Sequence, residues 1–71
     1  MFVITGRLGN RKSYWCGSRF GTIAMAILYQ DYEVACDDTC YCQEHPGYYC
    51  GIEEYNQKPL KTQVIKWNLH L

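Results

Sequence analysis

The feature that most constrains the fold of this chain is a cysteine-rich window in its middle. Four of the five cysteines and one of the two histidines lie there, in the order Cys36, Cys40, Cys42, His45 and Cys50. Tetrahedral zinc takes four cysteine or histidine ligands, and a small fold is stabilised by such a staple. We therefore expect a structural zinc site with Cys40, Cys42, His45 and Cys50 as its ligands and Cys36 as the alternative ligand.

Two other fates for these thiols stay open at this point. Reduced cysteine packs as a small apolar side chain and is often interior. A disulfide, for example between Cys42 and Cys50, is the other alternative. The odd number of cysteines and the absence of a signal-peptide pattern after Met1 favour the cytoplasm and reduced thiols. We therefore expect a cytoplasmic protein.

The spacing of the zinc candidates resembles that of a known metal-binding motif. Their pattern, Cys40-x-Cys42-x2-His45-x4-Cys50, is similar to the retroviral-type zinc knuckle in its H-x4-C half. The likeness covers about 11 residues of the chain. It implies a compact zinc-bound loop and binding to RNA.

Length and charge narrow the class of protein. The chain has 71 residues, which fits one domain, 1–71, near the lower limit for folding on a single core. Its net charge is zero, whereas a dedicated nucleic-acid binder carries a basic face and a DNA mimic is strongly acidic. No segment approaches the ~20 apolar residues of a membrane span, so we expect no membrane contact. No oligomeric state follows from the sequence.

The first half of the chain reads as a hairpin followed by a helix. Residues 2–5 and 13–16 are rich in aromatic and β-branched residues and flank the turn signal Gly9-Asn10. Apolar residues from Phe20 to Leu28 then recur with helical spacing, which predicts one helix from about Arg19 to about Cys36. A rival interpretation breaks the chain at Asp31, with residues 23–29 extended and a second helix capped by Asp31.

The second half predicts a loop and two strands. Residues 37–39 read as loop, 48–52 as a strand that runs toward Tyr55, and 62–69 as the last strand. The order predicts an α+β fold, ββαββ, with one helix packed on an antiparallel sheet and a cysteine-rich loop. We expect the apolar stripe of the helix to be buried against Val3, Trp15, Ile52, Ile65 and Trp67.

The functional prediction rests on the large number of aromatic residues. Seven tyrosines, two tryptophans and two phenylalanines exceed what one small core needs, and tyrosine is a common interface anchor. We expect a small non-enzymatic protein-binding module that inhibits or modulates a larger macromolecular machine. Its size fits a phage genome, so we include host machinery, such as a defence complex, among the targets. The expected partner-binding residues are Tyr41, Tyr48, Tyr49, Tyr55, Glu53 and Glu54.

Two alternatives from other classes accompany this prediction. The first is a zinc-stabilised nucleic-acid-binding protein. The second is a thiol-based redox or metal enzyme, although no local signature pairs a cysteine with a histidine as nucleophile and base. The expected nucleic-acid contacts of the first alternative are Arg7, Arg11, Lys12, Arg19 and Tyr14.

Overall fold

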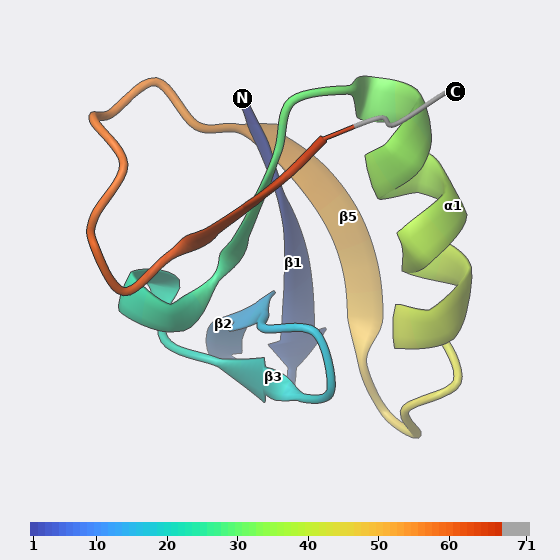
Figure 1. Cartoon of the computed structure of the whole chain (residues 1–71). Helices are drawn as coiled ribbons and strands as arrows, with labels where there is room; N and C mark the ends of the chain where they lie inside the picture. Colours follow the sequence, from blue (N-terminus) through green and yellow to red (C-terminus); the bar gives the residue numbers. More distant parts are fainter. Residues whose placement is uncertain (68–71) are drawn as a thin grey trace.

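The computed structural model describes residues 1–67 of the chain. These residues form a small mixed α+β domain in which a helix lies against a curled sheet (Figure 1). The elements follow one another as β1 (Phe2–Leu8), β2 (Arg11–Trp15), β3 (Phe20–Gly21), the 3-10 helix η1 (Ile23–Met25), β4 (Ile27–Tyr29), α1 (Tyr32–Cys42), β5 (Tyr49–Glu54) and β6 (Val64–Lys66).

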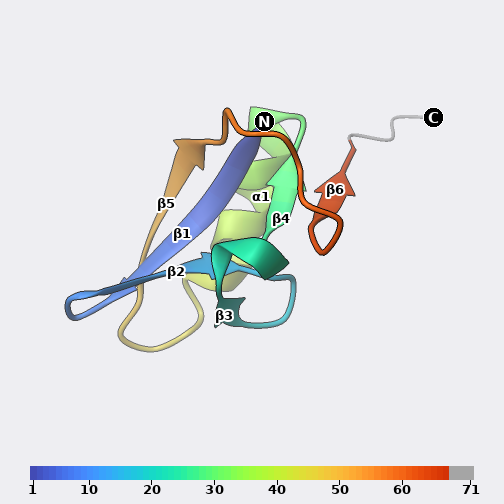
Figure 2. The same cartoon turned by 90° about the vertical axis from the view of Figure 1, so that its left-hand side faces the viewer.

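Strand β1 is the centre of the sheet. One of its edges pairs with β5 in antiparallel register along residues 2–7. The other edge pairs with β4 at Phe2 and with β2 along residues 5–8. Strand β3 extends the sheet beyond β2, and β6 extends it beyond β4 as a parallel neighbour. Because β2 and β4 use the same edge of β1, the sheet curls on itself, as the two perpendicular views show (Figures 1 and 2).

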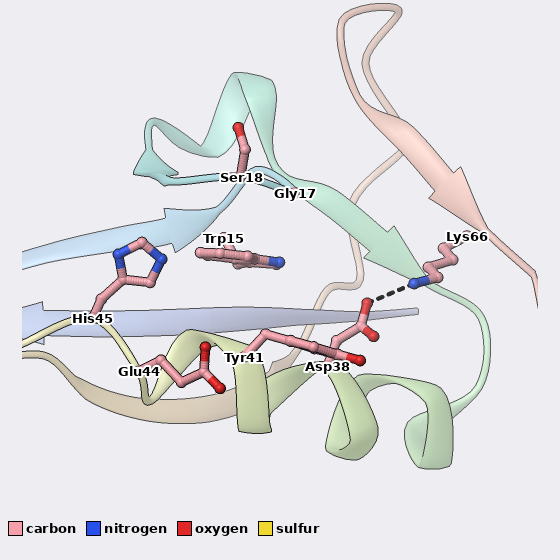
Figure 3. Close-up of a pocket in the computed structure, with 8 residues that line it drawn as sticks. All are labelled: Trp15, Gly17, Ser18, Asp38, Tyr41, Glu44, His45 and Lys66. Carbon is pink, nitrogen blue, oxygen red and sulfur yellow. Dashed lines mark hydrogen bonds and ion pairs between the residues drawn. The ribbon is translucent and has the colours of Figure 1, made fainter.

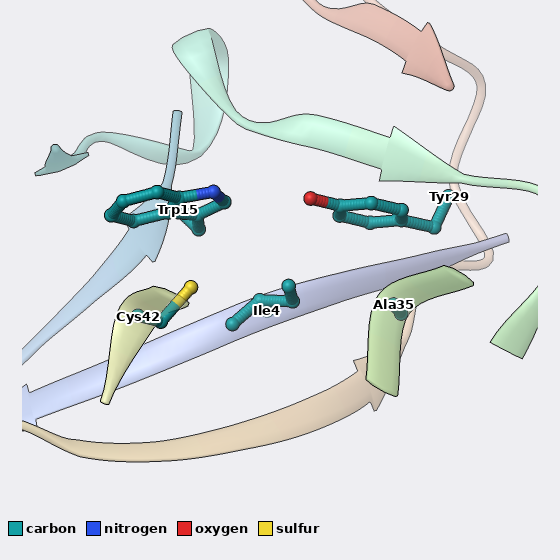
Figure 4. Packing of buried hydrophobic residues seen from close by; sticks show 5 residues of the cluster. All are labelled: Ile4, Trp15, Tyr29, Ala35 and Cys42. Atoms are coloured by element: carbon teal, nitrogen blue, oxygen red, sulfur yellow. The ribbon is translucent and has the colours of Figure 1, made fainter. Parts of the chain in front are cut away.

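Each face of the sheet covers its own apolar cluster. Helix α1 lies on one side of β1, and η1 with the connection between β5 and β6 lies on the other (Figures 1 and 2). Neighbouring residues of a strand point to opposite faces, so consecutive residues of β1 and of β4 enter different clusters. The cluster under α1 contains Ile4, Trp15, Tyr29, Ala35 and Cys42 (Figure 4). The cluster on the far face contains Val3, Ala26, Leu28 and Tyr55.

The long helix predicted from about Arg19 to about Cys36 is wrong, and the rival break at Asp31 is right. The rival's extended segment, residues 23–29, is right only for its second half, because Ile23–Met25 form η1. The apolar run forms β3, η1 and β4, and α1 begins only at Tyr32. The carboxylate of Asp31 accepts a hydrogen bond from the Glu33 N–H at 2.8 Å, which caps the helix there. The helical spacing gave the wrong result because Ile27 and Leu28, both assigned to one apolar helix face, belong to a strand and pack on opposite faces of the sheet.

Other parts of the expected ββαββ fold also change. Residues 37–39 belong to α1 rather than to a loop, so the cysteine-rich window is largely helical. The sheet is mixed rather than antiparallel, because β6 runs parallel to β4. Within the expected last strand, β6 covers Val64–Lys66, and residues 68 and 69 lie outside the described residues. Trp67, expected in the core, is 57% exposed because β6 has ended before it.

A buried amide closes the far face of the sheet. The Gln63 side chain donates from Nε2 to the Ile23 carbonyl at 2.9 Å and accepts at Oε1 from the Leu60 N–H at 2.7 Å. It also contacts the hydroxyl of Tyr55 in the buried cluster. Gln63 thus ties the long connection after β5 to η1, immediately before the chain enters β6.

The hairpin between β1 and β2 confirms the predicted turn. Gly9 has a φ of 61°, in the left-handed region that glycine adopts without strain. Gly6 is needed for a different reason, because a Cβ there would clash with the ring of Phe20. Among residues 1–67, no helix has the length and apolar character required to cross a membrane.

Candidate functional site

A pocket of about 450 Å³ lies between the C-terminal half of α1 and the end of β2. Figure 3 shows Trp15 on one side and Tyr41, Glu44 and Asp38 on the other. Pockets of ~300–1,000 Å³ are the usual size for ligand binding in proteins. The residues that line it are Trp15, Gly17, Ser18, Asp38, Tyr41, Glu44, His45 and Lys66.

Aromatic rings form the inner wall of the pocket. The indole of Trp15 is 5% exposed and meets the His45 ring edge-on, with centroids 5.3 Å apart. The Phe20 ring contacts both of these rings and stacks on Tyr48 at 4.3 Å. These ring contacts hold the turn after α1 against the end of β2, and they place Trp15 and His45 side by side in the pocket wall.

The acid deepest in the pocket already has partners. One carboxylate oxygen of Asp38 accepts hydrogen bonds from the Tyr29 hydroxyl and from Lys66 Nζ, each at 2.7 Å. The Asp38 side chain is largely buried, whereas that of Lys66 is half exposed. Burial, reinforced by this hydrogen bond and by the negative charge of Asp38, raises the pKa of Tyr29. The phenol therefore stays protonated and remains a donor to Asp38.

The second acid of the pocket is unpaired. Glu44 follows α1 and is exposed at the rim, and it makes no ion pair with any residue between 1 and 67. Its neighbour Tyr41 is 64% exposed and has no ring partner in the same part of the chain. Because Lys66 balances the charge of Asp38, the carboxylate of Glu44 leaves the rim attractive to a cation.

The four expected zinc ligands do not converge on one point. Cys40 and Cys42 are two residues apart in α1, so they lie on different sides of the helix: Cys40 is exposed and Cys42 is buried. His45 packs against Trp15, and Cys50 is a half-buried residue of β5. Within residues 1–67, no three His, Cys, Asp or Glu side chains gather where they could hold a metal ion.

The zinc prediction therefore has no support from the geometry. Substituting Cys36 does not change this, because it is an exposed residue of α1. The compact loop that the resemblance to the zinc knuckle implies is not formed, since its first two cysteines lie in a helix here. All five cysteines are free thiols, so the disulfide alternative between Cys42 and Cys50 is not formed in this structure.

Three thiols that are partly or fully buried have raised pKa values. Burial raises the pKa of Cys16 and of Cys50, and it raises the pKa of Cys42 to about 12, with smaller contributions from the charges of Cys50 and Asp38. The Cys42 Sγ also donates to the Asp38 carbonyl at 3.3 Å. Since the thiolate is the reactive form, these three cysteines give little support to the thiol-enzyme alternative.

The four tyrosines that were expected to form one binding face lie in four different places. Tyr55 is buried in the far-face cluster, where it contacts Gln63, and Tyr48 stacks on Phe20. Tyr41 lines the pocket, and Tyr49 is exposed on β5. Glu53 and Glu54 are also exposed on β5, where alternation places them on opposite faces.

Sequence reasoning missed two polar residues of the pocket, Asp38 and Lys66, which read as solvated charges. A signal for Asp38 exists once α1 is placed after Asp31. Ala35, Asp38 and Cys42 then fall at i, i+3 and i+7, on the buried side of the helix. No comparable signal marks Lys66, because its position depends on the parallel pairing of β6 with β4.

The basic candidates are divided as well. Arg7, Lys12 and Tyr14 lie on paired strands of the hairpin, whereas Arg19 lines a groove beside β3. Arg11 is next to Lys12 in β2 and so points to the other face of the sheet.

Comparisons of this chain with protein-family models, with curated proteins and with solved structures found no match.

Proposed function

We propose that this protein is a non-enzymatic binding module whose pocket captures an arginine side chain of a partner protein. The observation that carries the proposal is the unpaired carboxylate of Glu44 at the rim of a pocket walled by Tyr41 and Trp15. A positive group entering there gains an ion pair without displacing Lys66 from Asp38. A module that covers arginines on a larger macromolecular machine would inhibit or modulate that machine by blocking the surface.

Arginine suits this pocket better than lysine does. The guanidinium group is planar, so it stacks on aromatic rings and presents parallel N–H groups to a carboxylate. A cation within ~6 Å of an aromatic centroid gains roughly 0.5–2 kcal/mol. Tyr41 offers an exposed ring for such stacking, and Glu44 lies three residues further along the chain.

Paired substitutions test the proposal with a short peptide, Ac-Gly-Arg-Gly-NH2, titrated into the protein and followed by NMR. We expect Glu44→Gln and Tyr41→Ala each to weaken binding by about fivefold, which corresponds to ~1 kcal/mol. The matched controls are Glu33→Gln and Tyr32→Ala, which alter exposed residues of α1 that do not line the pocket. Equal losses in the pocket variants and the controls would refute a specific arginine pocket.

A further inference from the structure

The strand register builds a second surface, on the face of the sheet away from α1. Arg7 of β1 is paired with Lys12 of β2 on one side and with Tyr49 of β5 on the other. Residues directly opposite each other in antiparallel strands project to the same face. Lys12, Arg7 and Tyr49 therefore form one row across three strands. The row shares its face with Val3, which belongs to the cluster remote from α1.

The next row of the sheet has no side chain beside Tyr49. It consists of Tyr14, Thr5 and Gly51, which are paired across the same three strands. Gly51 carries no side chain, so nothing projects from the sheet at this position beside Tyr49. Tyr49 is 81% exposed, which leaves its ring open to solvent on this side.

Of the two cations on this surface, Lys12 is in an ion pair with another described residue and Arg7 is not. Arg7 makes no ion pair with any residue in the described part of the chain. Lys12 Nζ reaches across the sheet to Glu53, at 2.6 Å from Oε2, and lies 5.7 Å from the centroid of the Tyr14 ring. Glu53 is paired with Val3, so it borders the same face as the row. One acid thus holds one of the two cations of this surface.

We propose that this row binds single-stranded nucleic acid, with a base stacked on Tyr49 and phosphates held by Arg7 and Lys12. Exposed aromatic rings stack bases of any sequence, and cations beside them follow the phosphate backbone. Glu53 competes with a phosphate for Lys12, so the ion pair opens when the strand binds. This surface is separate from the arginine pocket. Of the nucleic-acid contacts expected from the sequence, it keeps Arg7 and Lys12, leaves out Arg11 and Arg19, and adds Tyr49.

The test measures binding of fluorescein-labelled ten-nucleotide oligo(dT) and oligo(U) by fluorescence anisotropy between 50 and 200 mM salt. We expect Tyr49→Ala to weaken binding at least fivefold. Arg7→Gln should weaken it and reduce the salt slope by about 0.7, the contribution of one phosphate contact on a single strand. Tyr32→Ala and Arg19→Gln are controls of matched composition away from this face, and they should change binding less than twofold.

The decisive pair is Glu53→Gln against Glu54→Gln. Both variants remove one negative charge, and the two positions are adjacent in β5, but only Glu53 holds Lys12. Glu53→Gln should tighten binding at least threefold, and Glu54→Gln should not. All these side chains are exposed, so unchanged circular dichroism is expected for each variant.

Three outcomes would overturn the proposal. The first is no binding of either oligonucleotide by the wild-type protein at 50 mM salt. The second is an equal gain in oligonucleotide affinity in Glu53→Gln and Glu54→Gln, which would mean that only the net charge of the protein matters. The third is full competition by a glutamate-rich peptide together with no loss in Tyr49→Ala, which would make the surface a site for acidic protein segments. Tyr41→Ala and Glu44→Gln should leave oligonucleotide binding unchanged, so failure here is distinguishable from failure of the arginine pocket.

Discussion

Replacing Gln63 by leucine tests how the connection after β5 is held. Leucine keeps a similar volume but offers no hydrogen bond, so the Leu60 N–H and the Tyr55 hydroxyl lose their partner. The Ile23 carbonyl keeps its hydrogen bond from the Ala26 N–H. A part-buried polar group left without a partner costs about 1–3 kcal/mol. For two such groups, one of them near the surface, we expect the free energy of unfolding to fall by roughly 2–4 kcal/mol.

That loss is large for a chain of this size. Natural domains are stable by about 0.05–0.15 kcal/mol per residue, which gives roughly 4–11 kcal/mol for 71 residues. Each lost kcal/mol lowers the melting temperature by about 4–8 °C in a domain of this length. The expected result is therefore a melting temperature roughly 8–32 °C below that of the wild-type protein.

Urea unfolding followed by circular dichroism measures the change directly. Gln57→Leu is the matched control, because Gln57 lies exposed in the same connection and should change stability by less than about 0.5 kcal/mol. A loss below about 0.5 kcal/mol in Gln63→Leu, or equal losses in both variants, would refute the role assigned to this amide. Because Gln63 immediately precedes β6, the variant should also loosen Lys66 at the pocket.

Three further predictions concern the helix, the hairpin and pH. Asp31→Ala should lower stability by about 1 kcal/mol in chemical denaturation, whereas Asp31→Asn keeps the capping acceptor and should lose much less; equal losses would contradict the cap. Gly6→Ala should cost about 1–3 kcal/mol, because the new methyl group meets the Phe20 ring, and unchanged thermal unfolding would contradict this close approach. Because burial raises the pKa of Cys42 from 9.0 to about 12 in the folded protein, the unfolded chain releases this proton first, so the contribution of this group to stability is complete below pH 9 and is lost between pH 9 and 12. Cys42→Ala should make the alkaline decline shallower in urea titrations, while the raised pKa values of Tyr29, Cys16 and Cys50 retain part of it, and identical declines would refute the assignment.

Local patterns predicted those elements that depend on neighbouring residues. The Gly9-Asn10 turn, the flanking strands and the strand toward Tyr55 follow from turn chemistry and residue type. The region from Phe20 to Tyr29 was harder, because short apolar runs fit a helix as well as strands buried on both faces. Asp31 was the deciding residue, since an N-cap there excludes a helix that continues through it.

The candidate site was less predictable because it is assembled from distant segments. Trp15, Asp38 and Lys66 meet only after α1 is placed over the sheet and β6 pairs in parallel with β4. The tyrosine density suggested a single binding face, but burial of Tyr55 and stacking of Tyr48 divide it. The cysteine window pointed to a metal, whereas its helical conformation spreads the thiols around α1.

The most direct test of the arginine pocket compares two ligands that differ in charge alone. Ac-Gly-Arg-Gly-NH2 and the same peptide with citrulline have nearly the same shape, but citrulline is neutral. We would titrate each into the ¹⁵N-labelled protein and follow the indole N–H signals of Trp15 and Trp67. We expect the arginine peptide to shift the Trp15 signal saturably, and the citrulline peptide to bind several-fold more weakly and to leave Trp67 unchanged. Equal responses to the two peptides, or a shift at Trp67 without one at Trp15, would contradict this expectation.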